Sequence, residues 1–176
     1  MSVCVRCLTR NNSVQKWPSL EFLIQEWVAQ RNEIPSDVLE HILYPIQDSG
    51  LSVYELVEDE EDAKLRVVTA LQLGRNQSIS GPWGCLSFES ALLTDLEIPP
   101  VGVQGETADA TVNGWHRDLE ALSTRQAAAL AATIARHGSF KSFVAAEMLK
   151  CAKDLWNAGD LQAERVSQAV RKQLQG

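Results

Sequence analysis

The first strong helical pattern in the chain covers residues 19–32. Its apolar residues recur three and four positions apart, which places them on one face of an α-helix. They are Leu20, Leu23, Ile24, Trp27 and Val28. Pro35 disfavours helical backbone at the residue before it, so this helix is expected to end near residue 32. A second helix is expected to begin after Ser36 and to end before Pro45.

The apolar and polar positions of residues 52–73 fit two structures. In the first, the runs on either side of the acidic segment 59–62 are the strands of a β-hairpin, because valine, tyrosine and threonine favour strands. In the second, one helix begins near Asp59 and directs Leu65, Val68 and Leu71 inward. The segment lacks the Asn-Gly or Asp-Gly of a tight hairpin turn, which counts against the first structure. We expect the hairpin and keep the helix as the alternative.

The clearest pattern lies after residue 122 and predicts three helices. Ser123 and Gln126 have the spacing of a capping box, and the alanine-rich run that follows has high helix propensity. Gly138 and Gly159 are well placed to end helices. Short connections between the three helices predict that neighbours are antiparallel. The expected fold is therefore mainly α, of the α+β class: a helical bundle with a C-terminal three-helix unit and a small β-hairpin near residues 52–73.

Glycine and proline suggest how these elements are organised. Residues 75–114 hold five of the ten glycines and three of the six prolines, so we expect an irregular connection there. The expected parts are a flexible N-terminal arm at 1–16, an N-terminal α+β part at 17–74, this connection, and a C-terminal helical part at 115–176. A short strand through residues 3–8 is an alternative for part of the arm.

Four cysteines among 176 residues are too few for a disulfide scaffold. The chain begins without the basic start and apolar run of a signal peptide, and no apolar run is long enough to span a membrane. We therefore expect a cytoplasmic protein in a reducing compartment, with no membrane partner. Cys4 and Cys7 have the spacing of half a zinc site, but a structural zinc site needs four ligands and no second pair is present. No metal and no cofactor are expected.

The sequence also contains little that points to catalysis. Phosphate-binding glycine loops, the nucleophile elbow and the His-Glu-x-x-His zinc motif are all missing. His116 has two carboxylates close in sequence on its C-terminal side, at Asp118 and Glu120. We expect a non-enzymatic interaction or assembly protein that self-associates through its helices. A small enzyme is a third possibility, with a site assembled in the fold near His116 or Cys85.

Two sets of residues are candidates for partner binding. Trp83 and Trp115 lie in glycine-flanked, loop-like stretches, and Ala128 and Ala132 form a small-residue helix face, so these four are expected to contact a protein partner or a second copy. The alternative function is RNA binding. Residues 51–110 carry eleven acidic and three basic side chains, whereas residues 111–176 carry nine basic and six acidic ones, so the C-terminal helices offer a basic surface. Its candidate residues are Arg125, Arg136, Lys141, Arg165, Arg171 and Lys172.

Overall fold

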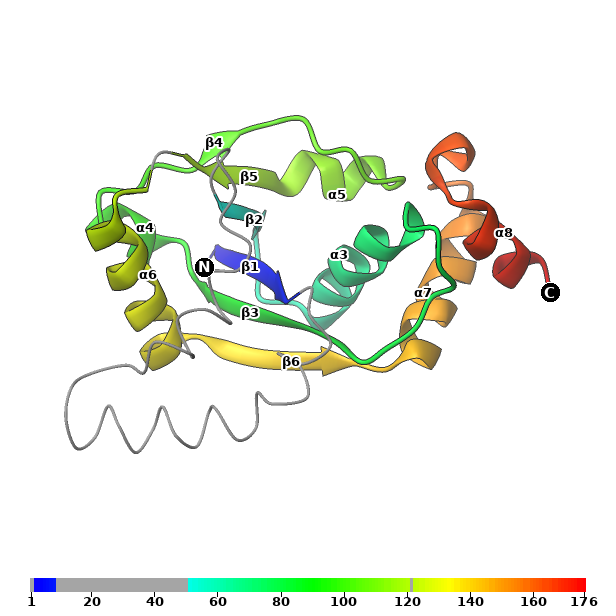
Figure 1. Ribbon diagram of the computed structural model, residues 1–176, viewed down its shortest axis with the longest axis horizontal. Helices are drawn as coiled ribbons and strands as arrows, with labels where there is room; N and C mark the ends of the chain where they lie inside the picture. Colours follow the sequence, from blue (N-terminus) through cyan, green and yellow to red (C-terminus); the bar gives the residue numbers. More distant parts are fainter. Residues whose placement is uncertain (1, 9–50, 121) are drawn as a thin grey trace.

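An antiparallel β-sheet of six strands lies at the centre of the computed structural model, which describes residues 2–8, 51–120 and 122–176. The strand order is β4-β5-β2-β1-β3-β6, and helices pack around the sheet (Figure 1). The strands are β1 (Val3–Leu8), β2 (Leu51–Leu56), β3 (Trp83–Glu89), β4 (Val101–Gly102), β5 (His116–Leu119) and β6 (Ser139–Phe143). The expected helical bundle is therefore wrong, because the helices are arranged around a central sheet, although α3, α7 and α8 also pack on one another.

Six α-helices and one 3₁₀ turn accompany the sheet in the described part of the chain. They are α3 (Glu61–Leu73), α4 (Ala91–Asp95), α5 (Ala110–Trp115), α6 (Thr124–His137), α7 (Ala145–Ala158), η1 (Ala163–Arg165) and α8 (Gln168–Gln175). The helices expected at residues 19–32 and 36–44 lie outside the described residues.

Strand β1 occupies the middle of the sheet. It pairs with β2 on one side, where Val5 lies opposite Tyr54, and with β3 on the other, where Cys7 lies opposite Cys85. Every residue from Val3 to Cys7 is buried. The short strand named above as the alternative for residues 3–8 is present. Each of the four parts expected from the sequence contributes at least one strand to the same sheet.

The expected hairpin at residues 52–73 is wrong, and the alternative helix is close to what forms. Residues 51–56 are strand β2, which pairs with β1 and β5, and residues 61–73 are helix α3. The acidic segment is the start of that helix, with Glu61 and Asp62 in its first turn, where the helix dipole favours negative charge. Burial of the apolar side of α3 against the sheet then outweighs the strand propensity of its valines and threonine.

The expected C-terminal three-helix unit is also wrong, because a strand separates its first two helices. The capping box of α6 is confirmed: the Ser123 hydroxyl accepts from the Gln126 amide and the Gln126 side chain accepts from the Ser123 amide. After α6, residues 139–143 form the edge strand β6 instead of a helix start. Gly84 on β3 allows this pairing, since a Cβ there would lie 2.6 Å from the Phe140 ring.

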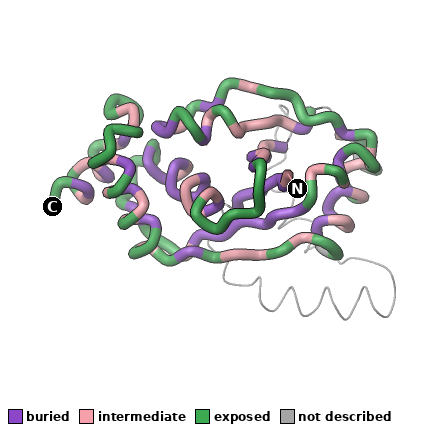
Figure 2. Tube along the Cα trace, turned by 180° about the vertical axis from the view of Figure 1, so that it is seen from behind, coloured by how far each residue is buried: buried purple, intermediate pink, exposed green. Residues whose placement is uncertain are grey.

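The core is divided by the sheet into two apolar clusters. One contains Val5 and Cys7 with the inner sides of α3, α7 and α8, and the other contains Cys4 with the inner sides of α4 and α6. Figure 2 shows the buried positions along the strands and on the helix sides turned toward them. Among the helices described, none has both the length and the apolar character needed to cross a membrane.

Candidate functional site

A cleft of about 540 Å³ opens where the end of α3 faces strands β2 and β5. Its floor is made by Tyr54 of β2 with His116 and Asp118 of β5, which lie on the same side of the sheet. One wall is the C-terminal end of α3 near Leu71, and the other is the extended segment 103–107. The cleft is therefore built from parts of the chain that are far apart in sequence.

Asp118 is a carboxylate held by a hydrogen bond in this cleft. One carboxylate oxygen accepts a hydrogen bond from the Ser52 hydroxyl at 2.9 Å, and the same oxygen lies 3.4 Å from Nε2 of His116. The side chain of Asp118 is 18% exposed, so it is partly shielded yet still reachable from the cleft. Its second oxygen has no hydrogen-bond donor among the residues that the structure describes and is available to a ligand.

The His116 side chain lines the cleft as an aromatic ring and does not act there as a proton acceptor. Burial lowers the pKa of this imidazole below its ordinary value, and the neighbouring Asp118 offsets that only in part. The ring is therefore neutral at pH 7 and does not cancel the charge of the carboxylate. Its Nδ1 is buried and has no hydrogen-bond partner within the described ranges. Neither ring nitrogen is thus presented as a free base to the cleft.

Tyr54 completes the aromatic part of the floor. Its ring centroid lies 5.3 Å from that of His116, with a tilt of 38° between the ring planes. Burial raises the pKa of the Tyr54 phenol well above its ordinary value, so the phenol keeps its proton and stays neutral. Two neutral aromatic rings therefore lie beside one fixed carboxylate.

The 103–107 wall is held in place by helix α5. Asn113 accepts from the backbone and hydroxyl of Thr107 at 2.8 Å each, and donates to the Thr107 carbonyl at 3.0 Å. Gly105 lets the segment approach this closely, because a Cβ there would lie 2.8 Å from Cα of Asn113. A side chain at position 105 would push the wall away from α5 and change the width of the cleft.

A buried ion pair ties the same region to α3. The Asp109 carboxylate is fully buried and accepts from Nε of Arg66 at 2.6 Å and from Nη2 of Arg66 at 3.0 Å. It also caps α5 by accepting from the amides of Thr111 and Val112. These four hydrogen bonds fix α5, and through it the 103–107 wall, against α3.

The four residues expected to contact a partner are not brought together by the fold. Trp83 lies within strand β3 and is buried, with the Arg75 guanidinium 4.4 Å from its ring centroid. Trp115 is half-buried at the end of α5. Ala128 is exposed and Ala132 half-buried on α6. Self-association through the α6 face stays a prediction.

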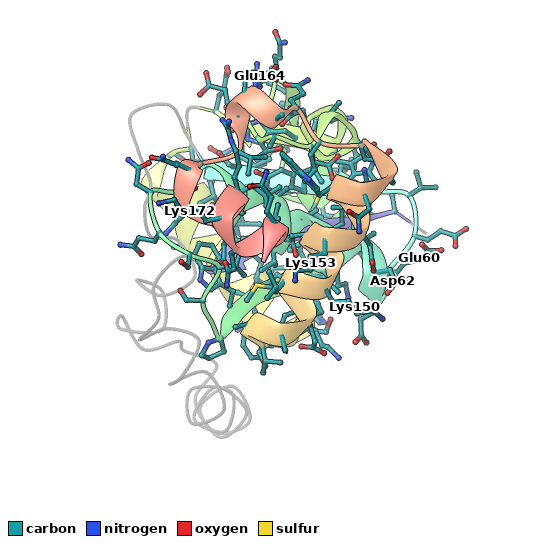
Figure 3. The ribbon with its side chains drawn as sticks, turned by 90° about the vertical axis from the view of Figure 1, so that its right-hand side faces the viewer. Glu60, Asp62, Lys150, Lys153, Glu164 and Lys172 are labelled. Atoms are coloured by element: carbon teal, nitrogen blue, oxygen red, sulfur yellow. The ribbon has the colours of Figure 1, made fainter. Side chains whose placement is uncertain are left out.

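The basic residues proposed for RNA binding are likewise divided between distant elements. Arg125 and Arg136 are on α6 and Arg171 and Lys172 on α8, at opposite ends of the molecule (Figure 1). Lys141 on β6 forms an ion pair with Glu61 at 2.6 Å. Figure 3 shows the α7 and α8 side, which carries Lys150, Lys153 and Lys172 together with Glu60, Asp62 and Glu164. The surface there is mixed in charge, and RNA binding also stays a prediction.

Cys4 and Cys7 point to opposite faces of β1, because they are three residues apart in a strand. They belong to different core clusters, so they cannot share a metal ion or form a disulfide with each other. No group of three or more metal-ligating side chains occurs in the part of the chain described. Burial raises the pKa of the Cys7 thiol well above its ordinary value, which makes this thiol a packing group.

We expect Cys7→Ser to lower the free energy of unfolding by about 1–3 kcal/mol, because the new hydroxyl is buried where the weakly polar thiol packed. Cys7 is only 3% exposed. Urea unfolding would measure the loss, with the half-buried Cys151→Ser as the matched control, for which we expect a smaller change. Equal stability of the Cys7→Ser variant and the parent chain would contradict the central placement of β1.

Comparison with family models, with curated proteins and with solved structures finds no match to the chain. The functional argument therefore depends on the cleft itself. Sequence reasoning named His116, with Asp118 and Glu120 near it, only as a place where an enzyme site could be assembled, and it assigned residues 115–176 to helices. In the structure, a spacing of two residues puts His116 and Asp118 on one side of strand β5. Sequence reasoning did not identify Tyr54 or Ser52, since nothing local in the sequence signals that β2 pairs with β5.

Proposed function

We propose that the protein is a non-enzymatic binding protein whose cleft takes the cationic group of a small ligand, an amine or a guanidinium. The observation that carries this proposal is the charge of the cleft. Asp118 and Glu106 line it, and no lysine or arginine does so among the described residues. An ammonium or guanidinium group is attracted by carboxylates and by the faces of aromatic rings.

The geometry favours a cation over a neutral polar ligand. A carboxylate that is partly buried interacts more strongly with a charge than one in bulk water, because the surrounding dielectric is lower. The hydrogen bond from Ser52 restricts the Asp118 side chain, so little side-chain freedom is lost when a ligand binds. Tyr54 and His116 then supply the aromatic surfaces that exclude water around the cation.

The arrangement supports binding more than catalysis. A general base must reach the proton that it removes, either directly or through one water. The Nδ1 atom of His116 is buried and Nε2 lies 3.4 Å from an Asp118 oxygen, so neither nitrogen is open to a ligand. The Ser52 hydroxyl donates to that carboxylate, and no histidine nitrogen among the described residues accepts from it to complete a triad.

The test is titration with butylamine and with agmatine, followed by ¹H–¹⁵N NMR. Butanol and butyrate serve as the neutral and anionic probes of similar size. We expect the two cations to shift the amide signals of His116, Asp118 and Gln104, and the other two probes to leave them in place. Asp118→Asn should weaken binding about tenfold to a hundredfold, because a hydrogen bond to a charged group is lost.

The matched control is Glu120→Gln, which removes an exposed carboxylate just beyond β5 and outside the cleft. We expect the affinity of this variant for agmatine to equal that of the parent chain. The proposal is rejected if butanol shifts the same signals as butylamine, or if Asp118→Asn and Glu120→Gln weaken agmatine binding equally.

A further inference from the structure

A second pocket, of about 470 Å³, adjoins the cleft and has the opposite charge. The two share Val103 and Gln104, and the second pocket extends from there between β4, α5, β5 and η1. Arg117 and Arg165 line it, and no acidic residue does so in the described part of the chain. In a protein with a net charge of −7, a concave site with this lining calls for an explanation.

Arg117 is held in a fixed orientation by three acceptors. Its Nε donates to Glu55 at 3.1 Å, and its Nη1 donates to the backbone carbonyls of Gly114 at 2.9 Å and His116 at 2.8 Å. The Nη2 group has no acceptor among the residues described. The guanidinium is therefore preorganised, with two N–H groups left for another partner.

Arg165 provides a second cation that is not neutralised within the described residues. Its one hydrogen bond there is a long one, 3.4 Å from Nη1 to the Thr107 carbonyl, and no described carboxylate lies within 4 Å of it. Arg117 is already paired with Glu55 at 3.1 Å, so a bound anion would compensate chiefly the charge of Arg165. The planar fork of each guanidinium matches the oxygens of a phosphate or carboxylate.

The pocket also has room and neutral donors. A Cβ built on Gly102 or on Gly114 meets no atom within 4 Å, so open space lies over both glycines. Gln104 and Gln162 add side-chain amides to the lining, and neither amide is used in a hydrogen bond within the described ranges. The pocket is far larger than the roughly 30 Å³ that one water occupies in the liquid, so it accommodates more than a bare ion.

We propose that this pocket binds a phosphate group, either as free phosphate or as the monoester of a small molecule. Phosphate is favoured over a single carboxylate because two guanidinium groups and two amides offer more donors than one carboxylate can accept. This site goes beyond the proposed cation cleft, since it takes a ligand group of opposite charge. The two sites can be tested separately, because different residues carry them.

The test is titration with inorganic phosphate and, in a second arm, with ribose 5-phosphate, at constant ionic strength maintained with sodium chloride. The amide signals of Gly102 and Gly114 report on the pocket, whereas those of His116 and Asp118 report on the cation cleft. Tighter binding of the monoester identifies an organic phosphate as the ligand, and equal or weaker binding identifies free phosphate. Either of these results supports the pocket.

Arg165→Gln is the informative variant, because Arg165 is exposed and its loss breaks no ion pair described in the structure. We expect phosphate affinity to fall at least about tenfold, since an interaction between two charged groups is lost. Gly114→Glu should abolish binding by placing a carboxylate in the open space of the pocket. Arg125→Gln, an exposed arginine on α6, is the matched control and should leave the affinity unchanged.

The proposal is overturned if neither phosphate nor ribose 5-phosphate shifts the Gly102 and Gly114 signals beyond the effect of added chloride. It is also overturned if Arg165→Gln and Arg125→Gln reduce the affinity equally, which would indicate attraction to general surface charge. Failure here leaves the amine titrations untouched, and failure of those titrations leaves this result untouched. If Gly114→Glu does not fold, Arg165→Gln alone decides.

Discussion

Replacing Asp109 with alanine is expected to lower the free energy of unfolding by about 3–5 kcal/mol, which is the usual result of removing one partner from a buried ion pair. The loss has two parts. Arg66, which is mostly buried, loses the two hydrogen bonds that compensate for its removal from water. Helix α5 also loses the cap on the amides of Thr111 and Val112. A domain of this size has only about 5–15 kcal/mol of stability in total.

Asp160→Ala is the matched control for this prediction, because Asp160 approaches the same guanidinium. Its carboxylate lies 3.5 Å from Nη2 of Arg66, but its side chain is 47% exposed. An exposed ion pair contributes less than about 1 kcal/mol, so we expect little change. Urea unfolding followed by tryptophan fluorescence would measure both variants. Equal losses would mean that burial is not what gives the Arg66–Asp109 pair its strength.

The Asp109→Ala substitution should also change the geometry of the two binding sites. The Thr107 hydroxyl accepts from the backbone amide of Asp109 at 3.3 Å and donates to Asn113 on α5 at 2.8 Å. Loss of the Asp109 carboxylate frees the start of α5 from Arg66 and from its cap, and so loosens the 103–107 wall that α5 holds through Asn113. The carboxylate lines neither site, so any change in binding would come through the position of segment 103–107. The contacts that position both sites therefore converge on the buried Asp109 carboxylate.

The features that the sequence predicted well are the local ones. The α6 capping box depends on Ser123 and Gln126, which are three residues apart, and it forms as expected. The secondary structure of residues 61–73 was ambiguous from the sequence, because valine and threonine favour strands while the acidic start favours a helix N-terminus. Only packing against the sheet decides between them. A local pattern contains no information about that packing.

The sheet could not be predicted, because its pairing joins distant segments. Strand β1 precedes β2 by more than forty residues, and β3 comes after a whole helix. Short strands that are buried on both faces have no alternating pattern, and β1 is such a strand: its residues are apolar on both sides apart from Arg6. The cation cleft depends on this pairing, which places Tyr54 opposite His116. Because local patterns do not reveal pairing between distant segments, neither the sheet nor the contribution of β2 to the cleft could be predicted.

Val5→Asp is expected to prevent stable folding, with a loss of more than about 4 kcal/mol. Val5 is fully buried in β1, between Tyr54 of β2 and Ser87 of β3. The substitution removes an apolar side chain from the core and leaves a carboxylate there without a basic partner among its paired neighbours, a change that belongs to the most destabilising kind. Circular dichroism and urea unfolding would show a reduced or absent cooperative transition.

Val57→Asp makes the same chemical change at a valine that is 79% exposed, just beyond the end of β2. We expect this control to stay within about 0.5 kcal/mol of the parent chain, as surface substitutions usually do. If residues 1–16 formed a flexible arm, Val5→Asp would be as harmless as Val57→Asp. A large difference between the two variants requires a buried central strand at residues 3–8. Both sites described above depend on that strand, since β2 and β5 are joined to the rest of the sheet through β1.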